Sequence, residues 1–322
     1  LAVSDDQLRV ISLVLDIKAL SLEVVIDTVR QILHQELANR DKGFEASLLQ
    51  FFHEFLQRSP INHIAQAKSS FLALLKDGLQ LNLPPAAMFL LLVNLHTYCV
   101  KIPGKDDRKS RKDTQDVAQR LIESCTSIAG LSLGSSAWFS RNLSVITLPE
   151  TTADESTPQS ECDTLGSDVK SEPASKPASG SNAGKHSTQA LVVLADVLAF
   201  LLDIVFGSEE KERVVNFLIN VMGNVTPYLR NHSVANVPSF RACCALVASL
   251  SGYQYTRKAW RKETFELFFE MNFFQMASEC AGNWRIIVDN LFTQDQASFR
   301  ELMARAVVTP SATISIFGNH EQ

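Results

Sequence analysis

The chain lacks a cysteine framework and a strong net charge. Its 322 residues include six cysteines, and no two of them form a C-x-x-C pair. This pattern excludes a small disulfide-stapled domain and favours reduced thiols in the cytosol. The formal net charge is −5, so charge alone provides no general attraction to nucleic acid. With 46% hydrophobic residues, the chain has the composition of an ordinary globular protein.

A recognisable leader and a clear membrane span are also missing. Leu1 occupies the first position, and Asp5 and Asp6 stand where a signal peptide would be basic. We therefore expect a piece of a longer chain without a signal peptide. The most apolar run, residues 190–206, contains Asp196 and Asp203. Because a bilayer span needs about 20 apolar residues and tolerates central carboxylates poorly, we expect this run to be a helix buried among other helices.

No stretch alternates apolar and polar residues as a half-buried strand would. Instead, apolar residues recur in steps of three and four, as they do on one face of a helix. Ser21 is a typical N-cap residue, and it precedes Leu22, Val25, Ile26 and Val29. The sequence therefore predicts consecutive amphipathic helices over residues 1–130 and again over residues 188–308.

These helices predict an all-α fold, namely an irregular HEAT- or armadillo-like α-solenoid of antiparallel helices with one long disordered insert. The insert is predicted at residues 149–187, where 19 of 39 residues are Pro, Gly, Ser or Thr and seven are acidic. Such a segment has too little apolar surface to offset the entropy of ordering. We expect helical segments at residues 1–148 and 188–308, and an irregular tail at residues 309–322.

Three segments resemble catalytic motifs only in part. Residues 130–134 read G-x-S-x-G around Ser132, but a helical pattern precedes them where a nucleophile elbow needs a strand. His53 begins an H-E-x-x-H pattern that ends at Gln57, so the second metal ligand is missing. Residues 180–186 are one residue short of a P-loop. We therefore expect no enzyme activity, no metal and no cofactor.

Two basic clusters are candidate contacts for anionic lipid. Each cation near an anionic membrane surface contributes about 1 kcal/mol, although a solvated loop and a polar helix face would look the same. The first cluster consists of Lys105, Arg108, Lys109, Arg111 and Lys112, and the second of Arg257, Lys258, Arg261 and Lys262.

From Trp260 onward the sequence resembles the Dopey family of very large cytosolic proteins. The resemblance rests on Trp260, the segments 265–268 and 273–276, Cys280, the segment 284–291, and Phe299 to Met303. The block is rich in aromatic side chains, which are too many to leave exposed, so we expect most of them to lock adjacent helices together. They are Trp260, Phe265, Phe268, Phe269, Phe273, Phe274 and Trp284.

The resemblance implies a fragment from the C-terminal part of a non-enzymatic scaffold or adaptor in Golgi and endosomal membrane trafficking. It implies a peripheral location on the cytosolic face of these membranes. The partners it implies are an Arf-exchange-factor-like HEAT-repeat protein, a phospholipid flippase and kinesin-1. The alternative, a peripheral membrane module that binds anionic phosphoinositide through the basic clusters, stays open at this point. The resemblance assigns no binding residues within this sequence.

Overall fold

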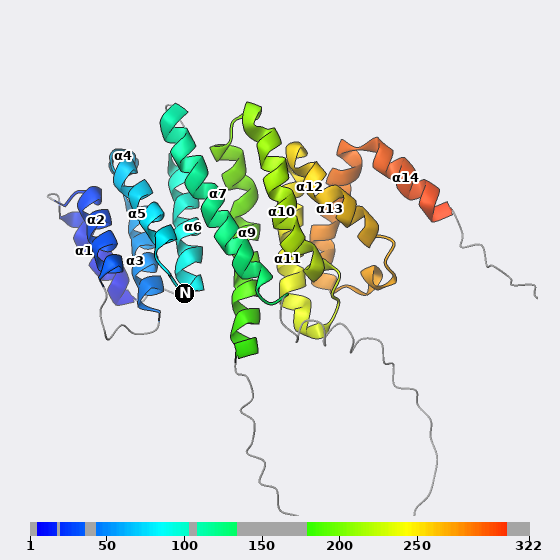
Figure 1. Cartoon of the computed structure of the whole chain (residues 1–322), viewed down its shortest axis with the longest axis horizontal. Coiled ribbons are helices and arrows are strands. Elements are labelled where there is room, and N and C mark those ends of the chain that lie inside the picture. The colour runs from blue at the N-terminus through cyan, green and yellow to red at the C-terminus, as the bar shows by residue number, and fades with distance from the viewer. Residues whose placement is uncertain (1–4, 18–19, 36–42, 103–107, 134–178, 308–322) are drawn as a thin grey trace, which may run out of the picture.

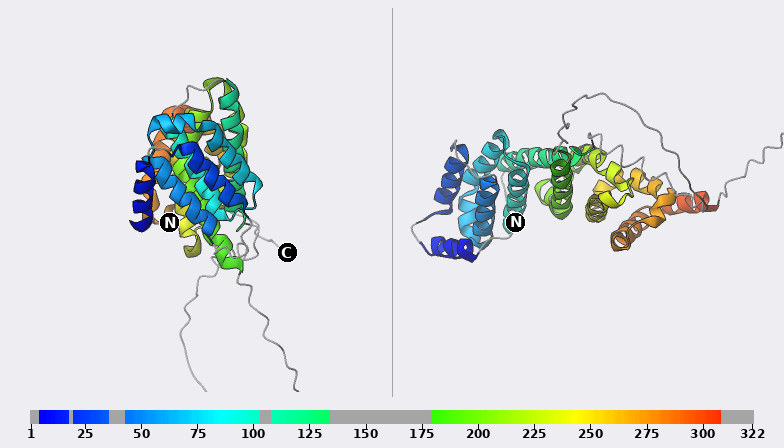
Figure 2. Two further views of the ribbon diagram at one scale, coloured as in Figure 1. Left: turned by 90° about the vertical axis from the view of Figure 1, so that its left-hand side faces the viewer. Right: turned by 90° about the horizontal axis from the view of Figure 1, so that it is seen from below.

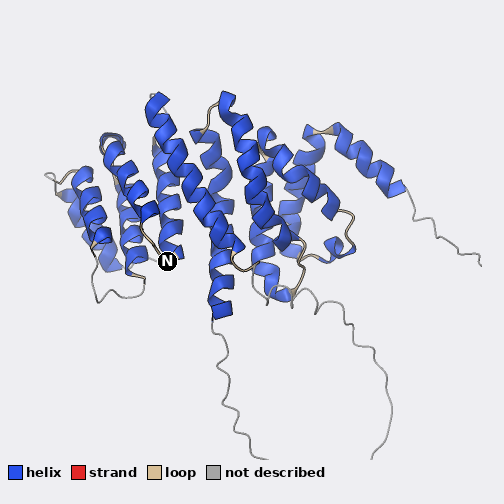
Figure 3. Ribbon diagram, viewed as in Figure 1, coloured by secondary structure: helices blue, strands red, loops and turns tan. Residues whose placement is uncertain are grey.

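A computed structural model describes residues 5–17, 20–35, 43–102, 108–133 and 179–307. These residues form thirteen α-helices with short 3-10 turns and contain no strand, as Figure 3 shows. The predicted all-α class is confirmed. The tail predicted at 309–322 and residues 149–178 of the predicted insert lie outside the described residues.

The helices stack in two rows (Figure 1). Neighbours in a row pack side by side, and most helices also pack against a sequence neighbour in the other row, as α6 does against α7 and α10 against α11. The first row consists of α1 (Asp5–Asp16), α3 (Phe44–Arg58), α6 (Pro85–Lys101), α9 (Ser179–Val205), α11 (Val237–Ser251) and α13 (Ala281–Gln294). The second row consists of α2 (Leu22–His34), α5 (Lys68–Gln80), α7 (Arg108–Gly130), α10 (Lys211–Leu229) and α12 (Arg257–Leu267).

Two further helices complete the stack. The short helix α4 (Ile61–Gln66) precedes α5, and α14 (Gln296–Val307) packs against α13 at one end. Seen along its edge, the stack is bowed, with the first row on the inner side of the bow (Figure 2). This arrangement is the irregular α-solenoid that the sequence predicts.

Local sequence explains where several helices begin. The Ser21 side chain accepts a hydrogen bond from the Val24 backbone N–H at 3.4 Å, which caps α2. Pro85 is the first residue of α6, where its missing N–H costs no helical hydrogen bond. After Pro60 the chain is helical again, and Ala67 divides this stretch into α4 and α5.

Helix α9 lies in the middle of the stack. It packs against α6, α7 and α11, and Leu194, Leu198 and Leu201 are fully buried. By length and composition, the segments Gly184–Val205 and Val234–Ser251 are apolar enough to span a membrane, but about half of each (50% and 56%) is buried inside the stack. As expected, the apolar run of residues 190–206 is packed among neighbouring helices.

The insert was predicted to extend to residue 187, and this boundary is wrong. Residues 179–187 form the first turns of α9. The reason is a side-chain bridge that composition does not reveal: the Ser187 hydroxyl donates to the Ile128 carbonyl at 3.0 Å and accepts from the Ser132 N–H at 3.3 Å. These bonds tie the start of α9 to the end of α7, and Ser187 is completely buried.

The predicted helical segments on either side of the insert share one hydrophobic core. Helix α7 precedes the insert and packs against both α9 and α10, which follow it. At the end of α7, the Tyr228 hydroxyl of α10 donates to the Ala129 carbonyl and lies 2.6 Å from the Ser132 hydroxyl. The insert therefore connects two helices that are already packed together.

Most of the aromatic block is buried, as predicted. Trp260 is fully buried, and Phe265, Phe273 and Trp284 are at most 8% exposed. Trp284 of α13 meets Phe273 edge-on at a ring-centroid distance of 4.8 Å, which joins α13 to the segment that follows α12. Phe274 departs from the prediction, because 81% of its side chain is exposed.

Candidate docking groove

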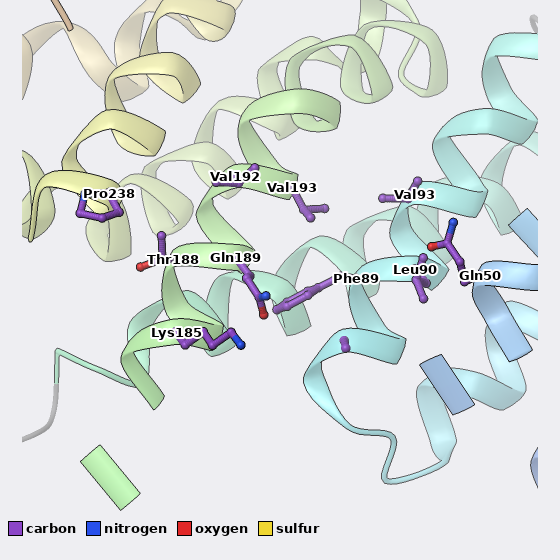
Figure 4. A pocket seen from close by; sticks show the side chains of 11 residues that line it. Gln50, Phe89, Leu90, Val93, Lys185, Thr188, Gln189, Val192, Val193 and Pro238 are labelled. Carbon is purple, nitrogen blue, oxygen red and sulfur yellow. The ribbon is translucent and has the colours of Figure 1, made fainter. Parts of the chain in front are cut away.

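An apolar cavity of about 510 Å³ opens between α6 and α9 on the inner row. In Figure 4, Val93 of α6 and Val193 of α9 point toward one another across it, and Phe89 lies beside Gln189. Val192 is 44% exposed, so the apolar lining is open to a partner. The lining residues are Gln50, Ala86, Phe89, Leu90, Val93, Lys185, Thr188, Gln189, Val192, Val193 and Pro238.

A second cavity of about 540 Å³ continues along the same two helices and shares Val93 and Val193 with the first. In the first cavity, residues 86–93 of α6 face residues 185–193 of α9. In the second cavity, the later residues 93–101 of α6 face the later residues 193–197 of α9. The two helices therefore run in the same direction. We call the two cavities together the α6–α9 groove. The second adds His53, Gln57, His96, Thr97, Val100, Lys101, Asp196 and Val197.

A buried polar bridge supports the floor of the groove. His53 of α3 and Asn94 of α6 are buried, and their Nδ1 and Oδ1 atoms lie 3.0 Å apart. Gln57 Nε2 donates to His53 Nε2 at 2.8 Å, so His53 Nδ1 carries the proton and donates to Asn94. Asn94 Nδ2 in turn donates to the Leu49 carbonyl at 3.4 Å. This bridge fixes α6 against α3.

We expect Asn94→Leu to lower the free energy of unfolding by about 1–3 kcal/mol, because it leaves the buried His53 N–H without an acceptor. Chemical denaturation followed by circular dichroism measures the change. Gln57→Leu is the matched control: Gln57 is exposed, so water can replace its bond to His53, and the loss should be smaller. Equal losses in the two variants would contradict this role for Asn94.

Polar side chains gather at the far end of the groove. Burial lowers the pKa of His96, and the nearby Asp196 carboxylate opposes this effect. The His96 ring meets Phe200 at a centroid distance of 5.5 Å, which holds Phe200 at the groove edge with 40% of its side chain exposed. Because the lowered pKa favours an uncharged His96 at neutral pH, His96 does not balance the charge of Asp196 at this end of the groove.

Lys101 lies at the same end but is engaged within the fold. Its Nζ donates to the carbonyls of Leu56 at 3.1 Å, Ser59 at 3.2 Å and Gln57. These carbonyls belong to the last turn of α3 and the residue after it, where a cation is favourable. Burial lowers the pKa of Lys101. Its charge therefore caps α3 and does not neutralise Asp196.

The motif-like segments have structural roles here. Ser132 follows α7 rather than a strand, and its hydroxyl contacts Tyr228. His53 belongs to the bridge described above, and residues 180–186 lie within α9. In the part of the chain that the structure describes, no group of three His, Cys, Asp or Glu side chains could hold a metal ion.

The structure divides the second basic cluster. Arg257 Nη1 donates to the Gln294 carbonyl at 2.8 Å, and Arg261 Nε lies 2.9 Å from Asp295 Oδ2. These two arginines therefore tie α12 to the end of α13. Lys258 and Lys262 face solvent. They are the members of this cluster that can reach a membrane.

The first basic cluster is described in part. Lys105 and the side chains of Arg108 and Lys109 lie outside the described residues, whereas Arg111 and Lys112 are exposed at the start of α7. Arg111 approaches Gly207, just before α10. Lys211 at the start of α10 lies 4.1 Å from the centre of the Tyr255 ring, just before α12. The two clusters therefore lie along one edge of the second row, which we call the basic edge.

Sequence reasoning did not identify the groove. A signal is present in α9, where Lys185, Gln189, Val192, Asp196 and Phe200 recur in steps of three and four and are all exposed. Val192 and Phe200 of this stripe are apolar, although a face of a helix that is exposed to solvent is normally polar. The facing residues of α6 are about 100 positions earlier, and no local pattern links them to α9.

Comparison with known proteins gives a consistent result. The model of the family described as DOP1 C-terminal matches residues 51–322. The Protein DOP1 homolog of Drosophila melanogaster is 38% identical over 98% of this chain and 12% of its own length. Protein DOP1B of Mus musculus is 38% identical over 98% of this chain and 14% of its own length.

A more distant relative, Protein pad-1 of Caenorhabditis elegans, is 27% identical over 99% of this chain and 16% of its own length. The chain thus spans between a tenth and a sixth of these relatives. No solved structure matches the chain.

Proposed function

The chain belongs to the DOP1 (Dopey) family, and on this premise we propose that it is a non-enzymatic helical scaffold that binds protein partners in membrane trafficking. The observation that carries the proposal is the α6–α9 groove. An open apolar groove on a folded surface is a typical place for a protein or ligand to bind. The engagement of His53, Lys101 and Ser132 within the fold supports a docking surface rather than a reaction centre.

The proposal extends to place and partners. Family resemblance supports a peripheral location on the cytosolic face of Golgi and endosomal membranes. It also supports binding to an Arf-exchange-factor-like HEAT-repeat protein, and to a phospholipid flippase or kinesin-1. A stack of helices suits this role because its long surface can hold several partners at separate sites.

Crosslinking mass spectrometry of the full-length protein in cells tests the scaffold proposal. Lys185 reports on the groove, and Lys258 and Lys262 report on the basic edge. We expect crosslinks from Lys185 to proteins of the trafficking machinery. Crosslinks within the stack together with none to any other protein would contradict the proposal, since they would show a folded and reactive protein without partners.

The basic edge favours a second candidate function, binding to an anionic membrane. Its two clusters lie on one edge, which allows them to contact one surface. Against this, Arg257 and Arg261 are bonded within the fold, and the exposed Glu209 and Glu212 lie between the clusters. We therefore place membrane binding second to partner docking.

This second candidate makes a clear prediction. The double variant K258E/K262E should lower flotation with phosphoinositide-containing liposomes about tenfold or more, because each cation contributes about 1 kcal/mol. The fold should survive, since Lys258 and Lys262 are exposed. Lys185→Glu is the control, because it reverses one charge on the inner row, away from the basic edge, and it should leave flotation unchanged. Unchanged flotation of the double variant would exclude the α12 lysines as the lipid contact.

A further inference from the structure

The α6–α9 groove contains one acidic side chain that the fold leaves unpaired. Asp196 is exposed and forms no ion pair with a described lysine or arginine, and the basic group that its carboxylate interacts with is the His96 imidazole, whose pKa burial lowers. By contrast, Asp203, about two turns further along α9, pairs with Lys211 at 2.6 Å. Lys101, which lines the same end of the groove, is bonded to carbonyls at the end of α3. A lysine or arginine that pairs with Asp196 would therefore come from outside the described part of the chain.

The groove has the length of a helical segment. Its α6 side extends from Ala86 to Lys101, which is about 22 Å at 1.5 Å per residue. Four turns of an α-helix cover this distance. The apolar part of the lining includes Phe89, Val93 and Val192, so an occupant needs an apolar stripe along several turns.

Backbone hydrogen bonding selects a helix over an extended peptide. Helices α6 and α9 bond their own N–H and C=O groups internally and offer no edge to a strand. One of the polar side chains that line the groove already has partners, since Thr188 Oγ1 is hydrogen-bonded to the Gly184 carbonyl and to the Ser239 hydroxyl. It is therefore not free to bind a peptide backbone. An extended peptide would lose water from its backbone without gaining partners, whereas a helix satisfies its own backbone groups.

We propose that the α6–α9 groove binds an amphipathic α-helix of a protein partner that carries a lysine or arginine on its apolar face, placed to pair with Asp196. Residues at i, i+3 or i+4, and i+7 of this helix pack on Val192, Val193 and Phe89, and the cation lies toward the Phe200 end. The proposal rests on the scaffold function and names the chemistry of one partner.

A display library of helical 18-residue peptides, selected on the full-length protein, tests this directly. We expect the selected peptides to share the apolar spacing and one basic residue. Val192→Arg should weaken their binding at least tenfold, because it places a charge in the apolar lining. Val192 is 44% exposed, so the variant should remain folded, which circular dichroism verifies.

A charge swap tests the ion pair. Asp196→Lys should weaken a selected lysine peptide about tenfold, and the same peptide with that lysine changed to glutamate should regain affinity for the Asp196→Lys protein. Asp116→Lys is the matched control, since it makes the same change at an exposed position on α7 in the second row. It should leave the affinity unchanged.

Three results would overturn the proposal: no enrichment of helical peptides, equal binding to the Val192→Arg variant, or no rescue in the charge swap. If a fluorescent fatty acid binds, Val192→Arg abolishes this binding and no peptide binds, the groove would be assigned to an acyl chain instead.

The scaffold function is separate from these outcomes. It survives if cellular crosslinks reach partners at other surfaces, and it fails if those crosslinks are absent even though peptides bind.

Discussion

Replacing Trp284 by alanine is expected to lower the free energy of unfolding by about 3–5 kcal/mol. The indole is 4% exposed and meets Phe273 and Phe268 at centroid distances of 4.8 Å and 5.9 Å. The substitution removes a large buried side chain where α13 meets the segment that follows α12, and it leaves a cavity that the surrounding helices cannot fill completely. Chemical denaturation of the chain, followed by circular dichroism, measures the loss.

Phe274→Ala is the control for Trp284. Phe274 belongs to the same aromatic block and contacts Phe273 edge-on at 5.3 Å, but 81% of its side chain is exposed. Its replacement should cost less than about 1 kcal/mol. A loss below 1 kcal/mol for Trp284→Ala as well would show that the aromatic block does not hold the helices together.

Leu198→Ala is expected to destabilise the helices on both sides of the insert, by about 2–5 kcal/mol. Leu198 is fully buried on α9, the helix that packs against α6, α7 and α11. Since the helices before and after the insert share one core, weaker packing of α9 should destabilise the helices on both sides. Hydrogen exchange read separately on α6 and α11 measures the two effects.

Phe200→Ala provides the comparison for Leu198→Ala on the same helix. Phe200 is 40% exposed, so its removal should cost about 1 kcal/mol or less. Faster exchange confined to α11 in the Leu198→Ala protein would show that α6 and its neighbours are stable without α9. That result would contradict a shared core.

Much of the fold could be predicted because helices of this kind are specified locally. The spacing of Leu22, Val25, Ile26 and Val29 predicts α2, and all four residues are buried. The long apolar run of α9 predicts a helix surrounded by others, which is its position in the stack. The family resemblance, based on the block from Trp260 onward, is confirmed by a family match over residues 51–322.

The remaining features depend on contacts between distant residues. Composition places Ser187 in the insert, but its bonds to Ile128 and Ser132 make it part of α9. The sequence presents Arg257 and Arg261 as members of a basic cluster, although their partners Gln294 and Asp295 are over 30 positions away. The groove has the same origin, because Val93 and Val193 are brought together by the stacking of α6 and α9.

Hydrogen exchange of the full-length protein with and without a selected helical peptide tests the docking account most directly. Exchange should slow along residues 86–101 of α6 and 185–200 of α9, because a bound helix would cover these groove walls and suppress their local opening. Protection confined to the start of α7 and to α12, or no protection in the presence of saturating peptide, would contradict it.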